Sequence, residues 1–246
     1  MAVRVAFDEV DSTQSVAIDR AKSGAPDGTY VVAGVQTNGT GRTGRSWSSP
    51  RGGLYVSWIG PGALTAPGLL PLAVAVEIRR ALPDGVRAQT RLKWPNDLLV
   101  LRVGHPAQKL AGILTDRVNG PDETIRAVVG VGLNVATPRT DLPEEIRSRT
   151  AILAELVDPA PDVREYEDRV VESIARAVAR LDTPEGRASV VAECREHLIG
   201  LGEPVRIDGR PVGTLRALCE DGAAAVEQDG TTFEIRAGEL TLPELA

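Results

Sequence analysis

The chain has 246 residues, a formal net charge of −6, 42% hydrophobic residues and 25% charged residues. This length can bury a sizeable core, and the composition is that of a globular protein with one large domain or one large and one small domain. The acidic balance argues against a general nucleic-acid binder, because neutralising phosphates requires an excess of Lys and Arg.

The sequence shows no sign of a membrane segment or a disulfide framework. The start, MAVRVAFDEV, lacks a long apolar stretch, and no apolar run approaches the ~18 residues that span a bilayer. Cys194 and Cys219 match no disulfide or metal spacing, and we interpret both as small buried apolar side chains. We therefore expect a cytoplasmic protein with no membrane contact and no tightly bound metal.

The first part of the chain is predicted to alternate strands with a helix. Residues 4–10 are expected to form a strand and residues 11–24 a helix, whose first N–H groups can be capped by the side-chain oxygen of Ser12 or Thr13. Residues 30–37 are typical of a buried strand, and a glycine-rich segment follows it directly.

The middle of the chain is predicted to be rich in strands and to end in helices. Strands are expected at 52–60, 90–94, 97–102, 109–118 and 124–135, and helices at 69–82, 163–181 and 184–198. Residues 137–149 are expected to form a loop. From Leu201 onward, short strands are separated by Asp-Gly pairs at 208–209, 221–222 and 229–230, which favour tight hairpins. A small antiparallel sheet or barrel should therefore end the chain.

The glycine-rich segment QTNGTGRTGRSW, residues 36–47, alternates glycine with cations and hydroxyls. It lacks the Gly-Lys-Ser/Thr ending of a Walker A loop, and no amphipathic helix follows it as a dinucleotide fingerprint requires. Arg42 and Arg45 supply planar charged forks suited to phosphate oxygens, and Trp47 can stack on a base or hinge the segment. A mobile, solvent-exposed loop is the alternative interpretation.

Three further segments carry polar residues in otherwise apolar strands. Asn96 and Asp97 follow Lys93 and Trp94 in RLKWPNDLLV, where they can order a hairpin turn or help hold a nucleotide and its magnesium ion. Lys109 begins the strand KLAGILTD, whose Gly112 suggests close approach by a ligand or another backbone. Asn134, in the buried run GVGLNV, needs hydrogen-bond partners from the backbone or from a ligand.

Taken together, DSTQ, QTNGTGRTGRSWSSPRGGLYVS, KWPNDLLV, KLAGILTD and GVGLNV resemble the biotin protein ligases in order and spacing, over residues 8–135. The resemblance implies an α+β fold. A mixed-sheet domain related to class II aminoacyl-tRNA synthetases would occupy residues 1–199, and a small SH3-like barrel residues 200–246. It also implies two reactions. The biotin carboxylate attacks the α-phosphate of Mg-ATP to give biotinyl-5′-AMP, and a lysine of a biotin carboxyl carrier protein then attacks that anhydride.

The resemblance also assigns roles to residues. The biotin-binding set would be Ser12, Thr13, Gln14, Gln36, Gly39, Thr40, Gly41, Arg42, Lys109 and Gly112. The nucleotide-binding set would be Arg42, Arg45, Trp47, Asn96, Lys109 and Asn134. Lys109 and Arg42 would be the catalytic pair, because two cations can offset the repulsion between the biotin carboxylate and the α-phosphate. No protein nucleophile is required.

The chain departs from the family pattern at three places. Thr40 stands where most members have arginine, Gln14 where asparagine is usual, and Thr115-Asp116 where an apolar residue and glutamate are usual. These departures put affinity in doubt more than activity. Thr40 is the one feature that favours the alternative of a degenerate protein that binds biotin or adenylate without turnover.

Two other functions occur among proteins that share the expected fold. Some family members repress transcription through an N-terminal DNA-binding domain, and since this chain begins at the first catalytic strand we expect no such role and no nucleic-acid partner. Lipoate ligases and octanoyltransferases share the fold but lack the segment that contains Arg42, Arg45 and Trp47. The expected assembly is a monomer or a homodimer.

Overall fold

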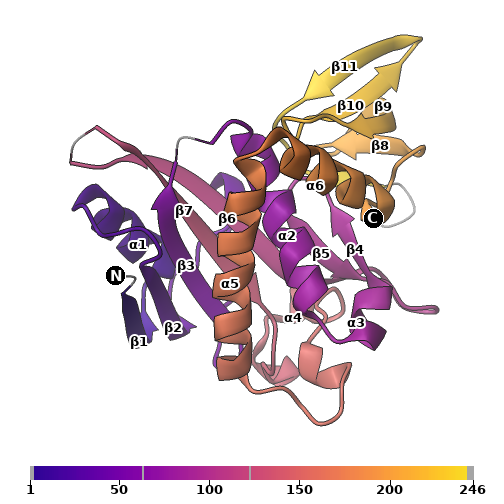
Figure 1. Ribbon diagram of the computed structural model, residues 1–246. Coiled ribbons are helices and arrows are strands. Elements are labelled where there is room, and N and C mark those ends of the chain that lie inside the picture. The colour runs from indigo at the N-terminus through magenta and orange to yellow at the C-terminus, as the bar shows by residue number, and fades with distance from the viewer. Residues whose placement is uncertain (1–2, 63, 122, 243–246) are drawn as a thin grey trace.

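The described residues of this computed structural model, 3–62, 64–121 and 123–242, form two sheets (Figure 1). The larger sheet has the order β1-β2-β3-β7-β6-β5-β4, in which only β1 and β2 pair in parallel. Its strands are β1 (Arg4–Val10), β2 (Tyr30–Gln36), β3 (Leu54–Pro61), β4 (Thr90–Lys93), β5 (Asp97–Val100), β6 (Gln108–Asn119) and β7 (Ile125–Leu133). The strands predicted for this part of the chain are all present, with ends that differ by a few residues.

Helices cover the two faces of this sheet unequally. The helices are α1 (Thr13–Lys22), α2 (Leu70–Ala81), α3 (Asp84–Gln89), α4 (Glu144–Arg147), α5 (Val163–Leu181) and α6 (Pro184–His197). In Figure 1, α2, α5 and α6 lie in front of the sheet, and their apolar side chains form the main core with it. On the other face α1 packs through Ala17 and Ala21 against Val31, Ile59 and Val128. On this face α1 lies over β2, β3, β6 and β7.

The second sheet is antiparallel and has the order β11-β10-β9-β8-β12. Its strands are β8 (Pro204–Ile207), β9 (Arg210–Leu218), β10 (Ala224–Gln228), β11 (Thr231–Ile235) and β12 (Leu240–Thr241). Asp208 and Asp229 have φ angles of 49° and 51°, and the glycine after each also has positive φ, so these pairs form the predicted hairpin turns. The two-residue strand β12 was not predicted.

Trp94 anchors the second sheet to the first. Its indole Nε1–H donates to the Gly222 carbonyl at 2.9 Å, and the side chain is buried. Arg195 of α6 adds a second link, since its Nη2 donates to the Leu218 carbonyl at 2.7 Å. The C-terminal sheet consequently lies against the turn that follows Lys93.

Some local expectations were wrong. The Ser12 side chain occupies the cap position of α1 but makes no capping hydrogen bond, because its hydroxyl lies against Thr40 instead. The expected loop at 137–149 contains the short helix α4. Cys194 is buried as expected, whereas Cys219 is partly exposed.

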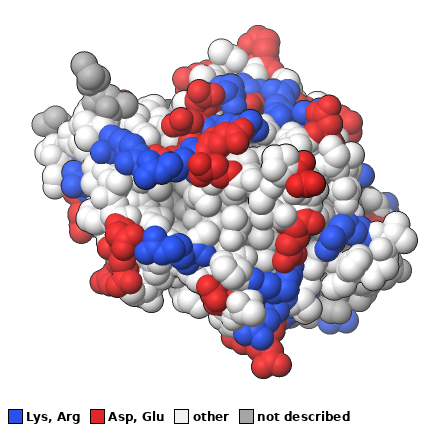
Figure 2. Space-filling model, turned by 90° about the horizontal axis from the view of Figure 1, so that it is seen from below, with Lys and Arg blue, Asp and Glu red and all other residues white. Residues whose placement is uncertain are grey.

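The surface mixes charges of both signs. On the face shown in Figure 2, basic and acidic side chains are interspersed around an uncharged central area. None of the helices among the described residues combines the length and apolarity needed to cross a bilayer.

A buried carboxylate joins the three helices on the front face. Glu77 of α2 contacts Arg80 at 3.1 Å, Arg176 of α5 at 3.2 Å and Arg180 of α5 at 2.7 Å, and only 3% of its side chain is exposed. Arg80 and Arg180 also contact Glu193 of α6. Removing the Glu77 charge would leave these guanidinium groups close together without their shared partner.

We expect Glu77→Gln to lower the free energy of unfolding by about 1–3 kcal/mol, because hydrogen bonds to charged groups are lost at a buried position. Glu172→Gln is the matched control, since Glu172 also contacts Arg176 at 3.2 Å but is 68% exposed. It should change stability by less than about 0.5 kcal/mol. Urea unfolding of both variants measures the difference, and equal effects would contradict a special role for Glu77.

Candidate functional site

The residues singled out in the sequence converge on a small cavity of about 150 Å³ on the α1 face of the large sheet. Those that line it are Ser12, Thr13, Gln14, Gln36, Thr40, Gly41, Arg42, Arg45, Trp47, Asn96, Lys109 and Gly112. They come from α1, from the end of β2, from the segment after β2, and from the β4–β5 turn and β6. The topology therefore brings together residues up to a hundred positions apart.

Glycines form the floor of this cavity. Gly112 of β6 and Gly132 of β7 are cross-strand neighbours, and a Cβ atom at either would lie 2.7 or 2.4 Å from the Trp47 ring. The Trp47 indole thus rests directly on the backbone of the two strands, and its Nε1–H is buried without a hydrogen-bond partner. The close approach expected at Gly112 is made by a tryptophan ring, and the unpartnered indole N–H is available to a ligand.

The inner end of the cavity is polar and closely hydrogen-bonded. The backbone N–H of Thr13 donates to Gln36 Oε1 at 2.8 Å, and the Thr13 hydroxyl lies 2.9 Å from the hydroxyl of Ser57. Ser57 in turn donates to Gln14 Oε1 at 2.9 Å. Ser57 was not singled out in the sequence, because a serine in a strand carries no signal of its own. This end of the cavity suits a compact ligand group with several hydrogen-bonding atoms.

A larger cavity of about 530 Å³ adjoins the small one and shares Arg45, Ser46, Trp47 and Lys109 with it. Asn134 lines this larger cavity, together with Lys93. The Asn134 amide donates to the Lys109 carbonyl at 3.1 Å, so backbone groups satisfy its nitrogen. Trp47 and Lys109 therefore stand at the junction of two compartments.

The two expected catalytic cations lie close to this junction. Lys109 Nζ is 2.7 Å from Asp97 Oδ1 and 5.0 Å from the centroid of the Trp47 ring. Arg42 Nη1 donates to Asn96 Oδ1 at 3.4 Å and to the Gly238 carbonyl at 3.3 Å. Burial, with a smaller contribution from the neighbouring Arg45, lowers the pKa of Arg42 from its ordinary value. A partly desolvated guanidinium of this kind favours an anionic ligand.

The glycine-rich segment folds as a hairpin-like arm, which we define as residues 36–49. Its two ends are joined by Gln36 N–H donating to the Ser49 carbonyl at 3.1 Å and Trp47 N–H donating to the Gly39 carbonyl at 2.8 Å. Gly39 lies in this neck, where a Cβ atom would be 2.5 Å from Ser49 Oγ. Gly39 does not itself line the cavity, but it packs against Gln36 and Trp47, which do.

The C-terminal sheet contributes one carboxylate that sequence analysis missed. Glu239 pairs with Arg45 of the arm, and its Oε1 is 3.1 Å from Lys93 Nζ. Although burial opposes it, the charges of Lys93 and Arg45 hold the pKa of Glu239 below its ordinary value. Glu239 also lines the larger cavity. No motif marked this residue, because its partners lie far away in the sequence.

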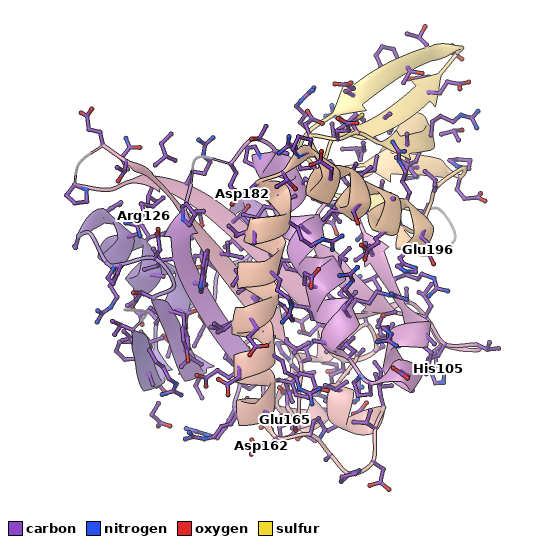
Figure 3. The ribbon with its side chains drawn as sticks, in the orientation of Figure 1. His105, Arg126, Asp162, Glu165, Asp182 and Glu196 are labelled. Carbon is purple, nitrogen blue, oxygen red and sulfur yellow. The ribbon has the colours of Figure 1, made fainter. Side chains whose placement is uncertain are left out.

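Other titratable candidates lie elsewhere. His105 is exposed on the loop between β5 and β6, at the edge of the molecule in Figure 3. Among residues 3–62, 64–121 and 123–242, no group of three or more His, Cys, Asp or Glu side chains is arranged to hold a metal ion.

We expect Gly132→Ala to displace the Trp47 ring, because its new Cβ atom would overlap the ring. Trp58 and Trp94 are buried, so Trp47 is the most accessible of the three tryptophans. Its displacement should shift the fluorescence emission to longer wavelength and increase quenching by acrylamide. Gly85→Ala is the control, since no atom lies within 4 Å of its Cβ position. Identical spectra for the two variants would contradict this placement of Trp47.

We expect Glu239→Gln to loosen the arm, because Arg45 loses its carboxylate partner. Trypsin should then cut after Arg42 or Arg45 about two- to five-fold faster, as expected when a partly exposed charged contact worth up to ~1 kcal/mol is removed. The pKa of Glu239 is lowered, so the contact persists above the ordinary carboxylate range and is lost when the pH falls through the lowered value. Glu234→Gln, which removes an exposed partner of Arg236, should leave the cutting rate unchanged.

Several known proteins are similar to this chain in sequence. The bifunctional ligase/repressor BirA of Bacillus subtilis is 35% identical over 60% of this chain, a match that spans only 45% of that protein. The biotin–[acetyl-CoA-carboxylase] ligase of Mycobacterium tuberculosis is 30% identical over 94% of this chain and 86% of its own length. The chain thus spans about half the length of the first of these relatives and most of the second.

The fold also matches a solved structure over nearly its whole length. The biotin protein ligase of Aquifex aeolicus, solved in complex with biotin and ATP, superposes with a TM-score of 0.80 at 29% identity and covers 98% of each chain. The predicted α+β fold of a biotin protein ligase is confirmed, whereas the SH3-like assignment of the C-terminal sheet stays a prediction. A profile of the biotin/lipoate A/B protein ligase family matches residues 6–134. The chain belongs to the biotin/lipoate A/B protein ligase family.

Proposed function

We propose that the protein is an ATP-dependent biotin–[biotin carboxyl carrier protein] ligase. It activates biotin as biotinyl-5′-AMP and transfers the biotinyl group to a lysine of a carrier protein. The observation that carries this proposal is the junction of the two cavities at Lys109 and Trp47. The small cavity, which is polar at its inner end, meets the larger cavity at the place where the biotin carboxylate and the α-phosphate of ATP would have to react.

The small cavity is suited to biotin. Its inner end offers the hydroxyls of Ser12, Thr13 and Ser57, which can hydrogen-bond a cyclic urea. The carboxylate at the far end of biotin would then point toward Lys109. The predicted roles of Thr40, Gly41 and Gly112 are consistent with this placement, because all three line the same cavity.

The larger cavity is suited to Mg-ATP, the co-substrate. Lys93, Arg45 and Lys109 lie along it and can hold phosphate oxygens, and Asn134 keeps an amide oxygen for the nucleoside. Asn96 holds the arm arginine Arg42 at the small cavity. When the biotin carboxylate attacks the α-phosphate, Lys109 and Arg42 stabilise the negative charge that develops, and pyrophosphate leaves.

The arm has a second task, which is to protect the product of the first step. A mixed anhydride hydrolyses readily, so the arm must exclude water until the carrier lysine arrives. The amine of that lysine then attacks the biotinyl carbonyl, an amide forms and AMP leaves. We propose a carboxylase carrier domain as the partner and a cytoplasmic location, where ATP is available. This partner is the acceptor that the second step requires.

The test is biotin-dependent release of pyrophosphate from ATP. Each contact from Arg42 or Lys109 to a charged group is worth ~1.5–3 kcal/mol, so Arg42→Ala and Lys109→Ala should each slow release by roughly ten- to a hundred-fold or more. Arg51→Ala is the matched control, because Arg51 is 65% exposed and pairs with Asp8 outside the small cavity. It should leave the rate within about two-fold of wild type.

The alternatives make different predictions in the same assay. A degenerate binder would bind biotin without releasing pyrophosphate, which would turn attention to Thr40, whose hydroxyl lies 3.2 Å from that of Ser12. A lipoate-type ligase would release pyrophosphate with lipoate or octanoate in preference to biotin. Either result would overturn the proposed function.

A further inference from the structure

Gln14 is held in the wall of the small cavity by three hydrogen bonds. Its Nε2 donates to Asp116 Oδ2 at 2.8 Å and to the Val128 carbonyl at 3.3 Å, and its Oε1 accepts from Ser57 Oγ at 2.9 Å. The side chain is only 5% exposed. Gly130 makes room for it, because a Cβ atom there would lie 2.5 Å from Gln14 Oε1.

Asp116 determines the orientation of the Gln14 side-chain amide. A carboxylate and a backbone carbonyl only accept hydrogen bonds, so the amide nitrogen must face them and both of its hydrogens are used. The amide oxygen must then face Ser57. Without the carboxylate the reversed amide would lose only the weaker bond to Val128, and the two orientations would become closer in energy.

The orientation of the amide sets the direction of the hydroxyls beside it. The Ser57 hydrogen is committed to Gln14, and the Thr13 hydroxyl hydrogen is directed to Ser57 at 2.9 Å or to Gln36 Oε1 at 3.1 Å. Both hydroxyls therefore present lone pairs to the cavity, and Gln14 Oε1 keeps one as well. This end of the cavity is consequently an array of acceptors, matched to a ligand that offers N–H donors.

We propose that Asp116 is a positioning residue for the small cavity, which orients the Gln14 amide so that Ser57 and Thr13 accept hydrogen bonds from the N–H groups of the ligand. This inference rests on the proposed function, in which that ligand is the cyclic urea of biotin. Asp116 acts through Gln14 and lies behind it, and both residues are among those that depart from the family pattern.

The test measures biotin binding by calorimetry, together with KM for biotin and for ATP in the pyrophosphate assay. Asp116→Asn should weaken biotin binding about ten-fold, the equivalent of one hydrogen bond to a charged group, and raise KM for biotin while KM for ATP stays within about two-fold. Asp84→Asn, which removes an exposed partner of Arg87, should change neither constant.

A length-swapped pair provides the rescue. Gln14→Asn alone shortens the side chain by one methylene and should weaken its contacts with Asp116 and Ser57. Adding Asp116→Glu lengthens the carboxylate by the same amount and restores the first contact, so the double variant should recover part of the lost biotin affinity. This rescue also covers the case in which Asp116→Asn is too unstable to study, which a thermal melt would reveal.

The outcomes separate the two claims. The positioning role is overturned, and the proposed function left intact, if the wild-type protein binds biotin and Asp116→Asn binds it equally well. The same holds if the double variant binds biotin no more tightly than Gln14→Asn alone. A wild-type protein that binds no biotin overturns the proposed function and this inference with it. The inference is supported if both single variants bind biotin more weakly, KM for ATP is unchanged and the double variant regains biotin affinity.

Discussion

The site depends on a patch of sheet that carries no side chains. Gly112, Gly130 and Gly132 lie on adjacent strands, and at each of them a Cβ atom would overlap a residue of the site. Trp47 can rest on the backbone only because two of these positions are glycine, and Gln14 can fill its place only because of the third. A residue with a Cβ atom at any of the three positions would overlap Trp47 or Gln14.

Electrostatic pairing is the second constraint on the site. Lys109 is paired with Asp97, and both Lys93 and Arg45 are paired with Glu239, so these cations are partly neutralised by the protein itself. Paired charges tolerate partial burial far better than isolated ones. An anionic ligand must therefore compete with Asp97 and Glu239 for the cations that would bind it. The arm, the β4–β5 turn and the C-terminal sheet meet at these pairs, so ligand binding is coupled to the contact between the two sheets.

Much of this architecture could be predicted from the sequence because it depends on local pattern. Strands such as 30–36 and helices such as Val163–Leu181 are encoded by periodicity, and the Asp-Gly hairpins by two adjacent residues. The arm was recognised from its glycines and arginines. Its internal pairing was not, since nothing in the composition of residues 36–49 distinguishes a hairpin-like arm from a mobile loop.

The contacts that could not be predicted are those between distant residues. The hydrogen bond from Arg45 to Glu239 spans 194 positions and that from Gln14 to Asp116 spans 102. Neither pair forms a motif, and each depends on how two elements pack after the chain has folded. Asn134 illustrates the intermediate case: its burial was expected, but only the structure shows that its amide nitrogen bonds the Lys109 carbonyl.

The most direct measurement is a crystal structure of the protein with a non-hydrolysable analogue of biotinyl-5′-AMP. We predict that the bicyclic ring of the analogue lies in the small cavity against Thr13 and Ser57 and that its adenosine lies in the larger cavity. The linking group should lie within hydrogen-bonding distance of Lys109 and Arg42. An analogue bound with its nucleoside in the small cavity, or away from Lys109, would contradict the proposed site.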